Sequence, residues 1–74
     1  MPCIVRDGSF SVYVYANDHA PPHCHVLWEA GEKVAVVNLN SLSLIAGHRV
    51  PQAGMRLVRN HRAELLDAWN DLNP

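Results

Sequence analysis

Apolar and polar side chains alternate through most of the first half of this 74-residue chain. Alternation with a period of two is typical of strands whose two faces meet different surroundings. In residues 9–15, for example, Phe10, Val12 and Val14 fall on one face, and serines and tyrosines fall on the other. The pattern predicts strands at 3–6, 9–15, 23–29 and 33–39, and either a fifth strand or an extended connection at 41–46.

Residues that favour turns separate these strands. Asp7-Gly8 suits a tight hairpin because glycine tolerates a positive φ. Residues 17–22 interrupt the alternation, since Asn and Asp favour turns and the two prolines have no amide hydrogen for a ladder. Ala30-Gly31-Glu32 predicts a turn, and Gly47 ends the last extended segment.

In the last third of the chain the apolar residues recur with the period of an α-helix. On a projection of about 100° per residue that starts at Arg56, one stripe covers about 120°. It contains Leu57, Val58, His61, Leu65, Ala68, Trp69 and Leu72. Pro51 suits a first helical position, whereas Gly54 costs about 1 kcal/mol relative to Ala inside a helix. The chain is therefore predicted to be α+β, with a small antiparallel sheet of four to five strands packed on one C-terminal amphipathic helix.

Length and composition narrow the class. A chain of this size predicts a single domain, residues 1–74, and its 49% hydrophobic content predicts a packed core rather than disorder. The longest stretch without charged side chains, residues 34–48, is too polar and too short to cross a bilayer, and the N-terminus does not resemble a signal peptide. We therefore expect a cytoplasmic protein, with Cys3 and Cys24 reduced and packed as small hydrophobic residues.

The net charge of −1 conceals segregated charges. Residues 48–62 contain four arginines and no acid, whereas residues 63–74 contain three acids and no base. This order is the reverse of what the dipole of a single helix favours. A basic patch around Arg49, Arg56 and Arg59 indicates an acidic protein partner or nucleic acid, and a solvated face is the alternative. Because no aromatic residues are interleaved with the arginines, a protein partner is favoured over nucleic acid.

Three of the five histidines, His19, His23 and His25, fall within seven residues. Strand alternation puts His23 and His25 on one face with α-carbons about 6.6–6.8 Å apart, so both imidazoles can reach one ion. His19, brought back by the two prolines, is the predicted third ligand, and Asp18 is a fourth ligand or an orienting residue. Three protein ligands with an open position are typical of catalytic zinc, so a divalent metal such as zinc is the cofactor that this cluster predicts.

Two other interpretations of the histidines remain open. They can form a polar rim of hydrogen-bonded or solvated side chains, or His23 and His25 can act without metal as an acid–base pair. With Arg49 or Arg56 holding a phosphate, such a pair suits RNA cleavage. No glycine-rich phosphate loop, nucleophile elbow or Cys-x-x-Cys motif is present.

The sheet face that carries the histidine pair is semi-apolar. Its other members are Tyr13, Tyr15, Leu27, Val34 and Val36. One helix covers only one face of a sheet, so this face predicts a binding surface or a dimer interface. We expect Trp28 and Trp69 in the core on the other side, and His61 as a hydrogen-bonded group beside them.

Three segments together resemble a small bacterial family, the domain of unknown function forty-one sixty. They are Met1-Pro2, the segment N-D-H-A-P-P-H-C-H-V at 17–26, and L-V-x-x-H-x-x-E-L-L-x-x-W-N at 57–70. The resemblance implies a signature surface made of Asn17, Asp18, His19, His23 and His25, and a helix signature of His61, Glu64 and Trp69. It also implies a toxin-like role, because members are typically encoded beside a second small protein in pairs that look like toxin–antitoxin modules. The chain departs from the family at Cys24, where an aromatic or β-branched residue is usual, and at 41–54.

Two function predictions follow. The first is a toxin-like component of a two-protein module that acts by binding a small cognate protein. The alternative is a small hydrolase or ribonuclease that uses His19, His23 and His25, with or without a metal ion, and has His23 and His25 as catalytic candidates. The predicted binding surface comprises Asn17, Asp18, His19, His23, His25, Tyr13, Tyr15, Arg49, Arg56 and Arg59.

Overall fold

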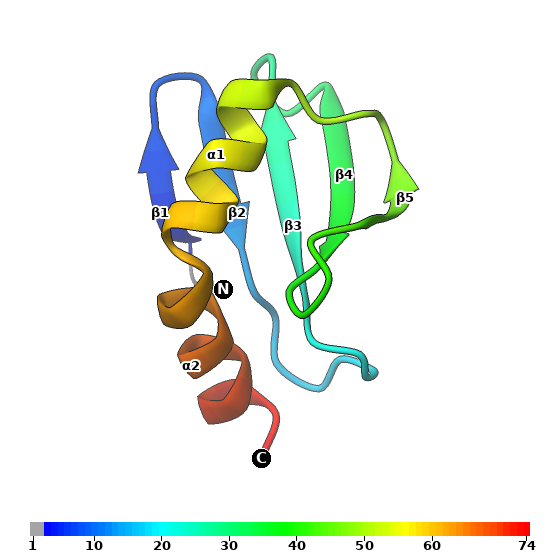
Figure 1. Cartoon of the computed structure of the whole chain (residues 1–74), viewed down its shortest axis with the longest axis vertical. Helices are drawn as coiled ribbons and strands as arrows, with labels where there is room; N and C mark the ends of the chain where they lie inside the picture. Colours follow the sequence, from blue (N-terminus) through cyan, green and yellow to red (C-terminus); the bar gives the residue numbers. More distant parts are fainter. Residues whose placement is uncertain (1–2) are drawn as a thin grey trace.

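The computed structural model describes residues 3–74, with side chains from Val5 onward. Five antiparallel strands form one sheet in the order β1-β2-β3-β4-β5, and two helices follow (Figure 1). The strands are β1 (Cys3–Asp7), β2 (Phe10–Tyr13), β3 (His23–Trp28), β4 (Lys33–Asn38) and β5 (Leu44–Gly47), and the helices are α1 (Gln52–Asn60) and α2 (Arg62–Leu72). The predicted α+β fold is confirmed, and of the two alternatives for residues 41–46 the fifth strand is correct.

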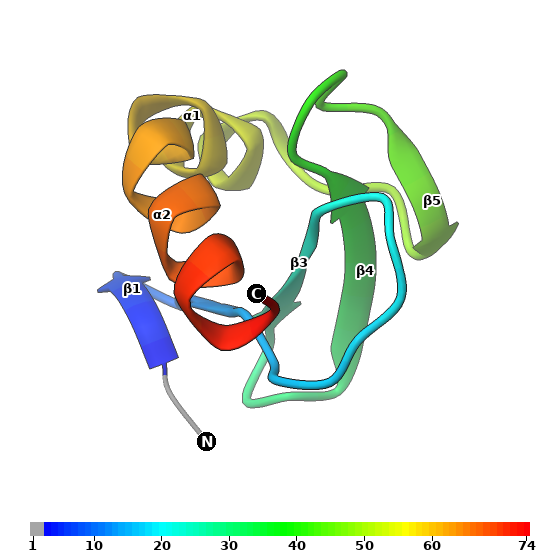
Figure 2. The same cartoon turned by 90° about the horizontal axis from the view of Figure 1, so that it is seen from below.

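Both helices lie on the same face of the sheet, and the core lies between them and the strands (Figure 2). The side chains that alternation assigned to this face are buried there: Val12, Val14, Cys24, Val26 and Trp28. Leu57 and Val58 from α1 and Leu65 and Trp69 from α2 complete the contact. Both tryptophans are 5% exposed, as expected for core residues.

The face turned away from the helices has the composition that the alternation predicted. Tyr13, His25 and Val36 are cross-strand neighbours on β2, β3 and β4. Two residues further along β3, Leu27 pairs with Val34 of β4. These side chains are half-buried except Val34, which is 40% exposed. His25 and its cross-strand neighbours therefore lie on the sheet face turned away from the two described helices.

Of the five strands, β2 and β5 differ most from the prediction. The β2 ladder ends at Tyr13, and Gly47 belongs to β5 rather than following it. Gly47 has φ +92°, and a Cβ there would overlap the carbonyl oxygen of Val34 on the neighbouring strand. Glycine is therefore required at this position by both backbone conformation and the approach of β4.

The prediction of a single C-terminal helix is wrong, because the helix breaks at His61. The backbone of His61 has φ −112° and ψ 17°, and its amide hydrogen is shared between the carbonyls of Leu57 and Val58. The ring Nδ1 also lies 3.0 Å from the Leu57 carbonyl, as a donor. The ring and the backbone of His61 therefore both donate to the Leu57 carbonyl, and the chain departs from helical φ and ψ at this residue.

The division into two helices also changes how the order of charged residues in 48–74 relates to the helix dipoles. Arg59 stands in the last turn of α1, and Glu64 stands in the first turn of α2. Each of these two charges is now favourable for the dipole of its own helix. The inference that helix stability does not explain the charges is therefore wrong for these two residues, although Arg49 and Arg56 remain without such an explanation.

Cys24 is a free, fully buried thiol on β3. Burial raises its pKa to about 12, so the thiolate is not formed near neutral pH. The expectation of a reduced, packed cysteine is confirmed for Cys24, whereas the side chain of Cys3 lies outside the described residues.

Neither helix is long and apolar enough to cross a membrane.

Candidate metal centre

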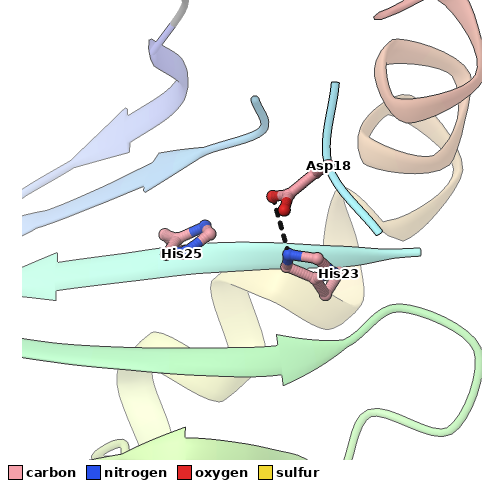
Figure 3. A group of neighbouring side chains, drawn as sticks. All are labelled: Asp18, His23 and His25. Atoms are coloured by element: carbon pink, nitrogen blue, oxygen red, sulfur yellow. Dashed lines mark hydrogen bonds and ion pairs between the residues drawn. The ribbon is translucent and has the colours of Figure 1, made fainter. Parts of the chain in front are cut away.

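The site forms where the β2–β3 connection enters β3. Asp18 belongs to this connection, His23 is the first residue of β3, and His25 follows on the same face (Figure 3). The connection turns sharply through Asn17, which has φ +58°, and through the Ala20–Pro21 peptide bond, which is cis. In the folded chain, the carboxylate of Asp18 lies beside the imidazoles of His23 and His25.

Asp18 and His23 form the central contact of the site. His23 Nε2 lies 2.8 Å from Asp18 Oδ2, and the two side chains are 12% and 27% exposed. On the other side of the ring, Nδ1 lies 2.8 Å from the carbonyl oxygen of Pro21. A carbonyl oxygen only accepts, so Nδ1 carries a hydrogen and donates it. Nε2 therefore faces the carboxylate either with a second proton, as an ion pair, or with a lone pair that a cation can bridge to Oδ2.

His25 presents a ring nitrogen that has no partner. Its Nδ1 is buried and makes no hydrogen bond within the described chain, although buried polar groups are almost always paired. The ring stands edge-on to Tyr15, with centroids 4.6 Å apart, and lies 5.4 Å from the ring of His23. Burial, and secondarily the neighbouring His23, lower the pKa of His25 below its usual 6.5. The imidazole is thus kept neutral near pH 7 with a lone pair available.

Asp18, His23 and His25 each offer a ligand atom, and these atoms lie within 4.8 Å of one another. Ligands about 2.0–2.2 Å from a tetrahedral zinc ion would be separated by about 3.3 Å. Binding would therefore draw the three atoms together by at most about 1.5 Å, which small side-chain rotations can provide. The three residues therefore lie close enough to hold one metal ion.

The end of α2 fixes the Asp18 segment. Asn73 Oδ1 accepts a hydrogen bond of 2.8 Å from the Asp18 amide, and its Nδ2 donates to the carbonyls of Tyr15 at 3.0 Å and Trp69 at 3.1 Å. The Trp69 ring also lies 4.9 Å from the ring of His23. The sequence analysis did not identify Asn73; its position at a helix end, followed by proline, was the available signal.

His19 does not take the position expected of it. Its side chain is exposed, it is not in the group whose ligand atoms lie within 4.8 Å, and its amide donates to Asp18 Oδ1 at 3.2 Å. Asp18, predicted as a fourth ligand or an orienting residue, is instead the third member of this group. Asn17 is exposed and serves the turn through its positive φ.

The two tyrosines of the predicted binding surface border the site. The rings of Tyr13 and Tyr15 are parallel, with an interplanar angle of 4° and centroids 6.2 Å apart. Burial raises the pKa of Tyr15, and Tyr13 and Asp18 add to the effect. Tyr15 therefore stays neutral near pH 7, and its ring packs beside the ring of His25.

The arginines of the predicted binding surface are not part of this site. The segment that leads into α1 lies at the opposite end of the sheet from the start of β3 (Figure 1). Arg49 lines a hollow there, and Arg56 and Arg59 are exposed on α1. The structure therefore does not bring Arg49 or Arg56 to the histidines, as the metal-free RNA-cleavage hypothesis requires.

A model of a known protein family matches most of the chain. The model of the family described as Domain of unknown function (DUF4160) matches residues 9–70. The chain belongs to this family. No curated protein and no solved structure matches it. The matched residues include Asp18, His23 and His25 and end before Asn73.

Proposed function

We propose that this DUF4160 protein binds one divalent transition-metal ion through Asp18, His23 and His25. The convergence of one carboxylate and two imidazoles carries the proposal, because one imidazole nitrogen is buried without a hydrogen-bond partner among the described residues and another is opposed to the carboxylate at 2.8 Å. The Pro21 carbonyl fixes the tautomer of His23 that leaves Nε2 for the ion, as backbone carbonyls do for ligating histidines in metal sites.

A set of two imidazoles and one carboxylate suits zinc and its first-row neighbours rather than calcium or magnesium. With three protein ligands, a position remains for water, and bound zinc lowers the pKa of such a water to about 7. Hydrolysis is therefore the chemistry that the proposal implies. The neutral His25 and the ordered Asp18–His23 pair favour this version over the metal-free ribonuclease, which lacks its phosphate-holding arginine.

Metal content and zinc titration test the proposal. Protein purified without a histidine tag should bind one equivalent of zinc in calorimetry, with nuclear magnetic resonance shifts at the start of β3. His25→Ala should weaken binding at least about 100-fold, since a direct ligand is lost. His19→Ala is the matched control and should bind like the wild type. Absence of stoichiometric binding, or equal losses in the two variants, would contradict the assignment.

A toxin-like role in a two-protein module is our second proposal. The sequence resemblance and the helix-free sheet face around Tyr13, Tyr15 and His25 support it. Induced expression in a bacterial host should slow growth, and co-expression of the small protein encoded next to it should restore growth and co-purify. Normal growth together with separate elution of the two proteins would reject this role without affecting the metal site.

A further inference from the structure

The edge of the sheet at β5 exposes more apolar surface than the other described strands. All four residues of β5 are exposed, and the side chains of Leu44 and Ile45 are each 48% exposed. In the order of the strands that the structure describes, β5 stands last and has only β4 beside it. Such an edge presents backbone donors and acceptors to any extended segment that lies beside it.

A hollow of about 570 Å³ adjoins this edge. It is lined by Leu42, Leu44, Arg49, Val50, Pro51, Gln52 and Met55. Leu42 and Met55 also pack against the core, so the floor of the hollow is anchored to the rest of the domain. The lining is apolar apart from Gln52 and one cationic side chain, Arg49.

The surroundings of the hollow are positively charged. No Asp or Glu occurs between Glu32 and Glu64, a stretch that includes β5 and all of α1. Arg49 and Arg56 are exposed, and the first turn of α1 carries no acid that could neutralise them. Arg49 also stands before the positive end of α1, where a cation is unfavourable for the helix itself. Local stability therefore does not account for Arg49.

We propose that the β5–α1 surface, made of Leu42, Leu44, Ile45, Arg49, Pro51 and Met55, binds an extended segment of another protein that carries apolar and acidic side chains. The segment would add to the free edge of β5 through its backbone. Its apolar side chains would enter the hollow, and its carboxylates would pair with Arg49. The inference depends on neither metal binding nor toxicity.

Charge and surface chemistry select this occupant. A second copy of the chain paired edge to edge would bring the same arginines together, and like charges oppose such a contact. Single-stranded nucleic acid would be expected to use exposed aromatic rings for stacking, and the lining of the hollow contains none. An acidic, apolar peptide satisfies both the charge and the hollow.

Selection from a library of random twelve-residue peptides displayed on phage tests the inference. Immobilised, metal-free wild-type protein should enrich peptides with acidic residues beside apolar ones. In ¹⁵N spectra these peptides should shift the amide signals of Leu44–Gly47 and of the hollow. Arg49→Glu should weaken their binding about tenfold or more, because attraction becomes repulsion. Arg59→Glu carries the same charge change outside the hollow and should retain wild-type affinity.

Four results would overturn the inference: no enrichment, peptides bound equally by Arg49→Glu, shifts confined to the face around Tyr13, or tighter binding of a twelve-nucleotide RNA to the same surface. Sedimentation at several concentrations adds a fifth, a dimer abolished by Ile45→Lys. Because Arg49 and Ile45 are exposed, both variants should keep the fold, which their ¹⁵N spectra verify. Since the metal-binding assay uses separate residues and a separate ligand, failure here leaves that proposal intact, and the reverse also holds.

Discussion

Replacement of Asn73 by alanine should weaken both the fold and the metal centre. The substitution removes three hydrogen bonds, one to the Asp18 amide and two to the carbonyls of Tyr15 and Trp69. A typical bond contributes about 0.5–1.5 kcal/mol, and these are part-buried, so water can replace some of them. We therefore expect a loss of about 2 kcal/mol in the free energy of unfolding, from a total of about 4–11 kcal/mol for a domain of this length.

The effect on metal binding has a separate cause. Without Asn73, the segment from Tyr15 to Asp18 loses its attachment to α2, and the carboxylate must be ordered at the moment of binding. Residues that orient ligands typically change metal affinity about 10–100-fold, so zinc should bind more weakly to Asn73→Ala within that range. The two histidines remain in place, and stoichiometry should stay at one.

Urea denaturation of the metal-free protein and calorimetric titration with zinc measure the two effects. In thermal denaturation, about 2 kcal/mol corresponds to a melting temperature roughly 10 °C lower for a domain of this size. Asn70→Ala makes the same chemical change on an exposed position of the same helix and should alter neither quantity. The reasoning is refuted if Asn73→Ala binds zinc like the wild type, or if Asn70→Ala loses as much affinity.

Three further predictions concern the core and the pH dependence. In Cys3→Ser protein, iodoacetamide should not label Cys24 at pH 8 until urea unfolds the chain, because the thiol is buried and its pKa is raised to about 12; rapid labelling of folded protein would disprove this. Burial lowers the pKa of His25, so the unfolded chain takes up a proton there more readily. Stability of the metal-free protein should therefore fall as pH drops below about 6.5, and less steeply in His25→Gln; identical urea profiles would count against it. Gly54→Ala should destabilise the fold by about 1 kcal/mol despite its better helix propensity, because the new Cβ would lie 2.6 Å from the Phe10 ring; a higher melting temperature would show that Phe10 moves away.

Much of the fold could be predicted because burial imposes a period on the sequence. Val12, Val26 and Trp28 are buried where alternation placed them, and the opposite face carries His25 and Val36 in one cross-strand row. The pairing of His23 with His25 on one face follows from strand geometry alone. These features depend only on local conformation and on which side of the sheet is covered.

The rest of the site depends on contacts that periodicity does not encode. His19 and Asp18 are neighbours in the β2–β3 connection, and the alternation of the strands does not show that the carboxylate of Asp18, rather than the exposed ring of His19, meets His23. The bonds from Asn73 join positions 55 and 58 residues apart in the sequence. No local pattern specifies such a pairing, which forms only when α2 packs across the end of the sheet.

The break at His61 shows how one misjudged element alters a functional argument. Treated as one helix, residues 52–72 have arginines first and acids last, which leaves either a partner-binding patch or a solvated face as the explanation. Treated as two helices, Arg59 and Glu64 each stabilise the end of a helix, whereas Arg49 before the start of α1 and Arg62 at the start of α2 oppose the dipole. Arg49 is the one of these that also lines the hollow beside β5. The case for a partner-binding surface therefore depends on Arg49 rather than on the whole basic block of residues 48–62. It predicts that Arg49 and Arg59 differ in their contribution to binding, whereas the continuous-helix interpretation predicts no such difference.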